Sequence, residues 1–289
     1  TTQEDSFAIM DRSLELGFNF FDTANVYGWK LGEGVTEQIV GRWFAQGGGR
    51  REKVVLATKV YGGMGKWPNQ VRLSALHIRQ ACEDSLRSMQ TDHIDLYYCH
   101  RWDDTTPIEE TLRALDDLIR LGKVNYIGAS AYAAWQLAHA NLLAELKGWT
   151  RFAVLQSEYN LLKRGVEREI LPYCRAHDVG FVPYYPLAGG FLTGKYAFGK
   201  APPPGSRGEN TRNVQELMVE RNYQVVTKLS AWAKDRGRGV NELAQAWLLA
   251  QPKVCSVITG AKNVEQLTSN VKTAGWHLSG AELSEIAGI

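Results

Sequence analysis

Four ionisable side chains of different chemistry stand where short apolar segments of the sequence end. Asp22 closes the segment Phe-Asn-Phe-Phe-Asp, Lys59 closes Val-Val-Leu-Ala-Thr-Lys, and His100 closes Ile-Asp-Leu-Tyr-Tyr-Cys-His. Tyr27 follows Asp22 after a few residues, in what should be a loop. If these segments are strands of a parallel barrel, their carboxyl ends meet at one face, and we expect the four groups to gather there.

Such a set is suited to protonating an oxygen atom. A phenol is a weak acid near neutral pH, and a neighbouring ammonium makes it a stronger one. A buried lysine needs a carboxylate, which Asp22 can supply to Lys59. His100 can donate a hydrogen bond to a substrate oxygen, so the four groups form a proton donor beside a polarised carbonyl. A reductant would have to come from a bound cofactor.

Each residue taken alone also has an ordinary structural explanation. An aspartate after a strand usually belongs to a turn or a helix cap, and a lysine at a strand end usually extends to solvent. A single histidine is more often a hydrogen-bonded structural residue than a catalyst, and a tyrosine before glycine usually packs a loop. The hypothesis depends on all four side chains occurring at one edge.

Seven short segments rich in β-branched and aromatic residues supply the predicted strands. They are residues 18–24, 54–60, 94–100, 124–130, 152–160, 180–187 and 255–261. Near-continuous apolar segments are typical of strands buried on both faces of a parallel sheet. Most begin roughly 30 to 40 residues apart, which leaves room for one helix and two loops. This alternation predicts an α/β protein, either an open doubly wound sheet or a closed barrel.

The predicted helices have recognisable ends. The sequence Thr-Pro-Ile-Glu at residues 106–109 is typical of a capping box with proline at the first helical position. Gly122 should end that helix, and Ser74 should cap another. A helix over about residues 6–16 has no strand before it, so an eight-stranded barrel would lack its first strand in this sequence. The proline-rich residues 201–205 should form a surface loop.

The composition excludes several classes of protein. The chain has 289 residues, 44% of them hydrophobic and 22% charged, with a formal net charge of +2, which favours a globular protein without a nucleic-acid or membrane surface. It has no apolar stretch of membrane-spanning length, and its first residues do not predict a signal peptide. The four cysteines, Cys82, Cys99, Cys174 and Cys255, form no close pair, so we expect a reduced cytoplasmic protein without a metal site.

Longer motifs resemble those of the aldo-keto reductase superfamily over nearly the whole chain. The sequence Phe-Asp-Thr-Ala-Asn-Val-Tyr-Gly at residues 21–28 resembles its Asp-Thr-Ala-x-x-Tyr-Gly motif, and Ala-Thr-Lys at residues 57–59 its Thr-Lys strand end. Residues 85–100 resemble its second signature. Residues 184–196 are similar to the seventh-strand motif of aflatoxin-aldehyde reductases and bacterial sugar-aldehyde reductases. The resemblance implies one (β/α)8 TIM-barrel domain over residues 1–289.

The resemblance also implies a reaction and the role of each residue. The family reduces aldehydes or ketones to alcohols with NADPH, which it binds without a Gly-x-Gly-x-x-Gly loop. Tyr27 would be the general acid, Lys59 and Asp22 the charged pair that adjusts its acidity, and His100 the group that orients the carbonyl.

Cofactor contacts carry over in the same way. Tyr184 would stack on the nicotinamide, and Ser130 and Gln156 would bind its carboxamide. Lys262 would meet the 2′-phosphate, which favours NADP over NAD. The remaining positions lie in the pyrophosphate and adenosine motifs: Leu187, Gly189, Gly190, Lys195, Gly260, Gln266 and Asn270.

Two positions depart from the family pattern, and three tryptophans indicate the substrate pocket. The family often has Asn where Ala131 stands, and usually Pro where Thr259 stands. Trp29, Trp67 and Trp102 fall in loops after successive strands, so they predict an aromatic, apolar pocket. They could equally serve only to pack the loops together.

Three functions remain open on the sequence. The first is NADPH-dependent reduction of a small carbonyl substrate. The second is an NADP-binding regulatory subunit, similar to potassium-channel β subunits. The third is a metal-dependent barrel hydrolase or lyase, which would need several histidine and acidic ligands at strand ends, where His100 is the one histidine. A homo-oligomer is possible in each case.

Overall fold

The chain divides into two units in a computed structural model that describes residues 2–28 and 34–289. The first unit comprises Thr1–Gln156 and Pro172–Gly180, and the second comprises Ser157–Leu171 and Phe181–Ile289. Strands β5 (Val154–Glu158) and β6 (Gly180–Tyr184) begin in the first unit and end in the second.

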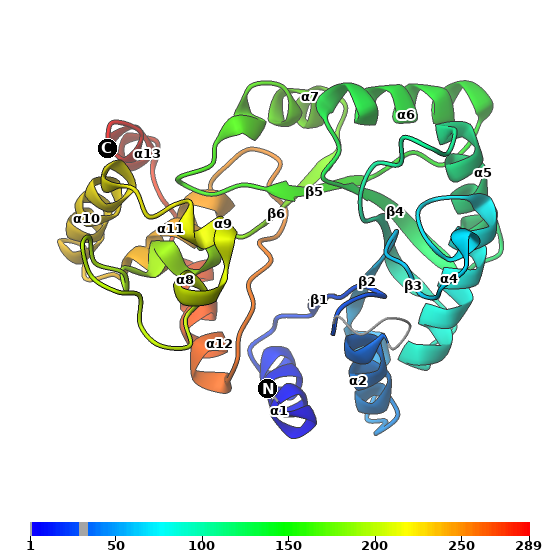
Figure 1. Cartoon of the computed structure of the whole chain (residues 1–289), viewed down its shortest axis with the longest axis horizontal. Coiled ribbons are helices and arrows are strands. Elements are labelled where there is room, and N and C mark those ends of the chain that lie inside the picture. Colours follow the sequence, from blue (N-terminus) through cyan, green and yellow to red (C-terminus); the bar gives the residue numbers. More distant parts are fainter. Residues whose placement is uncertain (1, 29–33) are drawn as a thin grey trace. The chain divides into compact units, whose positions relative to one another are not determined.

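Parallel strands in chain order form the sheet of the first unit (Figure 1). They are β1 (Phe20–Asp22), β2 (Val55–Val60), β3 (Ile94–Cys99), β4 (Val124–Ser130) and β5, and the described strand order continues to β6. Each adjacent pair from β1 to β5 is parallel. The predicted α/β class and the first six predicted strand segments are confirmed, although β1, β5 and β6 are shorter than expected.

Amphipathic helices alternate with these strands. Ser74 caps one of them, since its side chain accepts from His77 N at 3.3 Å, and Gly122, with φ of 70°, ends another. Both predicted signals are confirmed. The helices are α1 (Gln3–Glu15), α2 (Val35–Phe44), α3 (Arg50–Lys53), η1 (Pro68–Gln70), α4 (Ala75–Met89), α5 (Ile108–Arg120), α6 (Ala134–Lys147) and α7 (Ile170–Ala176).

The core of the first unit lies on both faces of the sheet. Ala57, Leu96 and Tyr98 pack together on one face, with Phe20 and Val154 against them. Inward residues of α4 and α5, such as Ile78, Met89, Leu112 and Leu115, are fully buried. Burying a large apolar side chain contributes about 1.5–3 kcal/mol, so these layers hold the strand ends in place.

Helices and irregular segments make up most of the second unit. Its core includes Phe191, Leu192, Leu229, Leu243 and Leu248, all buried. The predicted loop at residues 201–205 is confirmed. The helices are η2 (Gly165–Glu167), η3 (Ala188–Thr193), α8 (Arg207–Asn210), α9 (Arg212–Gln215), α10 (Glu220–Lys234), α11 (Val240–Leu249), α12 (Val264–Val271), η4 (Lys272–Gly275) and α13 (Gly280–Ala287).

The predicted strand at residues 255–261 is wrong. Only one bridge forms there, between Phe181 and Val254. Cys255 N donates to Phe181 O at 3.1 Å, but the next bond comes from Ile258 N to Pro183 O, one residue out of step. Proline has no N–H to donate to the neighbouring chain, so the ladder stops. The sheet therefore has six strands among the described residues, rather than the seven predicted from the sequence.

The predicted capping box at residues 106–109 is also wrong. Helix α5 begins at Ile108, with Pro107 at the N-cap and no side-chain cap. The hydroxyl of Thr106 instead hydrogen-bonds to Asp103. The Asp103 carboxylate also accepts hydrogen bonds from Leu73 N at 3.1 Å and from Thr105 N at 2.9 Å. The Thr106 hydroxyl therefore binds Asp103 and does not cap the start of α5.

Candidate active site

The four predicted ionisable residues gather at the carboxyl ends of β1, β2 and β3. We call Asp22, Tyr27, Lys59 and His100 the Lys59 corner. In the parallel register Asp22 pairs with Ala57, and Lys59 with Tyr98. His100 N donates to Val60 O at 2.9 Å immediately after β3. The structure therefore brings these residues together as the sequence predicted.

The Lys59 ammonium is fully buried, and each of its three hydrogens has an acceptor. Lys59 Nζ forms an ion pair with Asp22 Oδ1. It also donates to Thr23 O at 2.7 Å and to the Tyr27 hydroxyl at 3.3 Å, and it lies 4.8 Å from the centroid of the Tyr27 ring. A buried charge is tolerated when it is paired and hydrogen-bonded in this way.

Tyr27 and His100 meet edge to face. Their ring centroids are 5.8 Å apart, with an interplanar angle of 77°. Burial lowers the pKa of His100 to about 3, and the positive charges of Lys59 and Arg101 act in the same direction. The imidazole is therefore neutral near pH 7, so it can donate one N–H to an oxygen without carrying charge. The Tyr27 hydroxyl accepts from Lys59, so its own hydrogen is the one it can donate.

Gln156 has a contact that sequence reasoning missed. Its Nε2 donates to Asp22 Oδ2 at 2.9 Å, so the carboxylate of the corner is held by an amide as well as by Lys59. The main chain of Gln156 accepts from Ala131 N at 2.8 Å and pairs with Ser130 in the sheet. Ser130 at the end of β4 and Gln156 in the middle of β5 therefore lie side by side in the sheet. The hydrogen bond from Lys59 to the main-chain carbonyl of Thr23 was also missed, because any residue type can supply a main-chain carbonyl.

The three tryptophans have different surroundings. Trp102 packs edge to face on Tyr132 and Trp135, with ring centroids 5.1 and 5.8 Å away. Trp67 precedes η1 and is 73% exposed. Trp29 lies outside the described residues. The substrate pocket predicted from these residues stays a prediction.

In the second unit, the predicted pyrophosphate segment adopts an unusual backbone. Ala188, Gly189 and Gly190 follow one another with positive φ of 49°, 66° and 102°. A Cβ at Gly190 would lie 3.0 Å from Lys195 Nζ, so the ammonium sits over that glycine. Leu187 O accepts from Gly190 N at 2.8 Å. The segment therefore combines main-chain turns suited to glycine with a nearby cation.

Tyr184 and the predicted adenosine segment also belong to the second unit. Tyr184 is half-buried at the end of β6, edge-on to Tyr185 with centroids 5.6 Å apart. Lys262 is exposed, and its N–H donates to Gln266 Oε1 at 2.9 Å, just before α12. Asn270 Oδ1 accepts from Gln245 at 3.5 Å, and Gly260 has open space around its Cα. Lys262 thus directly precedes Asn263, the N-cap of α12, and the start of a helix favours anions.

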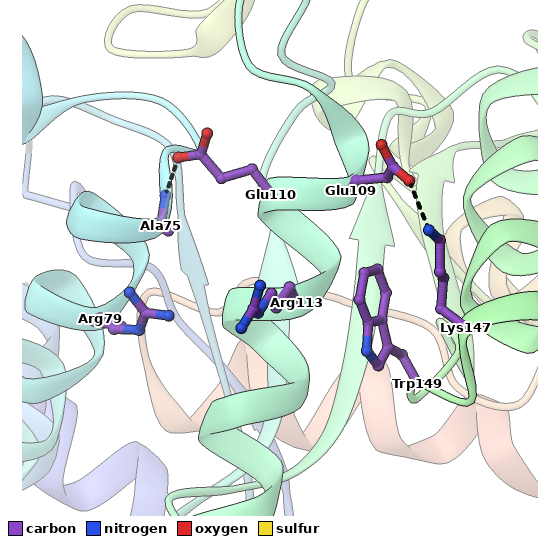
Figure 2. Close-up of a pocket in the computed structure, with 7 residues that line it drawn as sticks. All are labelled: Ala75, Arg79, Glu109, Glu110, Arg113, Lys147 and Trp149. Carbon is purple, nitrogen blue, oxygen red and sulfur yellow. Dashed lines mark hydrogen bonds and ion pairs between the residues drawn. The ribbon is translucent and has the colours of Figure 1, made fainter.

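A surface pocket of the first unit lies between α4, α5 and the end of α6 (Figure 2). Its charged groups are largely engaged: Glu110 accepts from Ala75 N at 2.8 Å, and Lys147 pairs with Glu109 at 3.3 Å. None of the predicted site residues lines it. The pocket therefore reflects helix packing rather than the candidate site.

The described residues show neither a metal-binding cluster nor a membrane-spanning helix. In residues 2–28 and 34–289, no group of three or more His, Cys, Asp or Glu side chains could hold a metal ion. Over the same residues, no helix combines the length and the apolar character needed to cross a membrane.

Comparison with known proteins assigns the chain to a family. The model of the aldo/keto reductase family matches residues 1–289. The chain is 43% identical to the uncharacterized oxidoreductase YrpG of Bacillus subtilis over 94% of this chain and 82% of that protein. It is 38% identical to a probable voltage-gated potassium channel subunit beta of Oryza sativa (92% and 80%) and 36% identical to norsolorinic acid reductase stcV of Emericella nidulans (99% and 72%). The chain therefore belongs to the aldo/keto reductase family.

Proposed function

We propose that this protein reduces an aldehyde or ketone to an alcohol with NADPH, and that Tyr27 is the general acid. Family membership supports nicotinamide-dependent carbonyl reduction in general. The observation that carries the specific proposal is the 3.3 Å contact between Lys59 Nζ and the Tyr27 hydroxyl. It puts a buried ammonium against the one phenol of the corner, as a proton donor requires.

The residues present suit a nicotinamide dinucleotide. In the first unit, the Ser130 hydroxyl and the side-chain amide oxygen of Gln156 are complementary to a carboxamide. In the second unit, the glycine turn with Lys195 suits a pyrophosphate, and Lys262 beside the start of α12 suits a 2′-phosphate. Leu187, Gly260, Gln266 and Asn270 complete the assigned contacts, and Tyr184 would stack on the nicotinamide. When bound, this cofactor supplies the hydride.

The protein's own part in the reaction is to hold the carbonyl oxygen and deliver a proton to it. The neutral His100 would donate an N–H to that oxygen and orient it. Tyr27 would give its hydroxyl hydrogen to the same oxygen as the carbonyl carbon is reduced. Lys59 would stabilise the resulting phenolate, and Asp22, held by Gln156, would keep the ammonium in place.

The proposal extends to the shape and setting of the protein. We place the chain in one (β/α)8 barrel domain, cytoplasmic, acting on a small molecule without nucleic acid or membrane. Family membership and the parallel strands in chain order support the barrel. Trp67 and Trp102, with Trp29, would line the substrate pocket. A homo-oligomer remains compatible with this proposal.

Replacing Tyr27 by phenylalanine tests the proposal. Tyr27→Phe should lower kcat for aldehydes by about 10²–10⁴-fold, because the general acid is lost, and should leave the Kd for NADPH within about twofold. Steady-state kinetics over a panel of aldehydes and a fluorescence titration with NADPH measure the two effects. Tyr126→Phe is the matched control, since Tyr126 is an exposed tyrosine of β4. Retained turnover in Tyr27→Phe would contradict the assignment.

A second candidate function is an NADP-binding regulatory subunit. It is favoured by the plant relatives named as probable channel β subunits, which are 38% identical to this chain. This alternative expects NADPH binding without turnover of any aldehyde, and capture of a membrane partner from solubilised membranes. Turnover by the wild type would favour the reductase.

A further inference from the structure

Glu37 is a buried carboxyl group to which the proposed reaction assigns no role. It lies in the first turn of α2 and is only 1% exposed. Its Oε1 accepts from the Thr58 hydroxyl at 2.6 Å. Among the described residues no lysine or arginine forms an ion pair with it at hydrogen-bonding distance. A carboxyl group buried without a cation is costly, so its position calls for an explanation.

The partner of Glu37 connects it to the Lys59 corner. Thr58 directly precedes Lys59 in β2. A strand residue is held on one face while its neighbour points to the other, so anchoring Thr58 fixes the direction of Lys59. The bond from the Thr58 hydroxyl is short and fully buried, which makes it a specific constraint on the end of β2.

The residue beside Glu37 makes a matching contact with the Tyr27 loop. The Thr36 hydroxyl lies 2.6 Å from the Thr23 hydroxyl, and Thr36 N donates to Tyr27 O at 3.3 Å. Thr23 is also the residue whose carbonyl receives Lys59. One helical turn therefore touches both the segment that carries the phenol and the strand that carries the ammonium.

The surroundings of Glu37 make its charge sensitive to pH. Burial raises the pKa of Glu37 to about 7, while the hydroxyls of Thr58 and Ser85 act in the opposite direction. Asp84 on α4 raises this pKa further, and Lys59 on β2 lowers it. Two other titratable groups face Glu37, namely Cys82 of α4 and Tyr97 of β3.

We propose that Glu37 is a positioning residue for the reaction, which anchors Thr58 and thereby sets Lys59 at its distance from Tyr27. Thr36 likewise anchors the loop that carries Tyr27, through its contacts with Thr23 and with the main chain of Tyr27. This inference rests on the proposed function for its kinetic effect, because the anchored lysine acts through Tyr27. Glu37 itself touches neither substrate nor cofactor.

Three variants test the kinetic effect. Glu37→Gln keeps an acceptor for Thr58 and should retain kcat within about threefold. Glu37→Ala and Thr58→Val each remove the bond and should lower kcat by about 10–100-fold through misplacement. All three should keep the Kd for NADPH and the KM for the aldehyde within about threefold. Glu52→Gln, an exposed residue of α3, is the control. A Thr58→Val enzyme with wild-type kcat would overturn the proposal, even if Glu37→Ala fails to fold.

A second measurement does not depend on turnover. Because its folded-state pKa is raised from 4.5 to about 7, folded Glu37 keeps its proton between these values while the unfolded chain loses it. Linkage then makes the wild-type free energy of unfolding fall as pH rises through this window. Urea unfolding from pH 4.5 to 8 should show that fall, and Glu37→Gln should show a smaller one.

The two measurements separate the two proposals. Identical pH profiles for the wild type and Glu37→Gln would overturn the buried anchor, whatever the kinetics. The wild type could also turn over no aldehyde and still differ from Glu37→Gln in its pH profile. That result would contradict the proposed reaction but support the role of Glu37 in anchoring β2.

Discussion

The Lys59 corner and the glycine turn of the second unit handle charge in opposite ways. In the corner, a fully buried ammonium is surrounded by acceptors at fixed positions, and Gln156 holds the carboxylate from behind. In the turn, the cation is the exposed Lys195, and the main chain at Gly189 and Gly190 has positive φ. Under the proposed function, the first arrangement would be organised in advance for a proton transfer, and the second would receive a ligand that brings its own charge.

The largest effect should follow from removing the buried ammonium. Lys59→Met should lower kcat by about 10³-fold, because Tyr27 loses the charge that supports its phenolate. It should also lower the free energy of unfolding at pH 7 by about 3–5 kcal/mol, since Asp22 is left as a buried carboxylate without its cation. Enzyme kinetics and urea unfolding measure these effects.

Lys53 is a matched control for this change. It is an exposed lysine at the end of α3, so Lys53→Met should change neither quantity measurably. If Lys59→Met kept wild-type stability, the corner would not be organised by the ion pair, and its contrast with the glycine turn would disappear.

A smaller effect should follow from the exposed lysine of the second unit. Lys262→Ala should weaken NADPH binding by about tenfold and leave NADH binding nearly unchanged, because only NADPH carries the 2′-phosphate. Titration with both dinucleotides measures the selectivity. Lys272→Ala, another exposed lysine of this unit, should affect neither. If Lys262→Ala weakened the binding of NADPH and NADH equally, Lys262 would not contact the 2′-phosphate.

The sequence predicted the Lys59 corner because strand geometry brings three of its four residues together, and Tyr27 follows one of them in the adjoining loop. Asp22, Lys59 and His100 each end an apolar segment, and parallel strands align such ends at one edge. Residue types then indicated the chemistry. The role of Gln156 at Asp22 was not predictable, because it joins residues of β1 and β5 that are not neighbours in the sheet.

The second unit was less predictable for a different reason. Its assigned residues came from family resemblance, because loops with positive φ are set by turn geometry and not by periodicity. The strand expected at residues 255–261 does not form, because Pro183 in the neighbouring strand β6 has no N–H to continue the ladder. The apolar pattern of one segment does not reveal that the segment beside it lacks a main-chain N–H donor. Glu37 escaped prediction in the same way, since a glutamate in an early helical turn ordinarily suits the helix dipole.

The smallest effect concerns Ala131, where the resemblance to the family leads us to expect asparagine. Ala131 follows β4 with φ of 54°, in the left-handed region that alanine rarely adopts and asparagine tolerates better. Ala131→Asn should raise Tm by about 1–3 °C, and its amide should add one hydrogen bond to the carboxamide, tightening NADPH binding by about two- to fivefold.

Ala131→Gly separates the two causes. Glycine also accepts the positive φ but has no amide, so it should leave the Kd for NADPH at the wild-type value. Thermal unfolding and NADPH titration of both variants give the comparison. If Ala131→Asn bound NADPH no more tightly than Ala131→Gly, the end of β4 and the middle of β5 would not contact the carboxamide. The roles of Ser130 and Gln156 would then reduce to supporting Asp22 and the sheet.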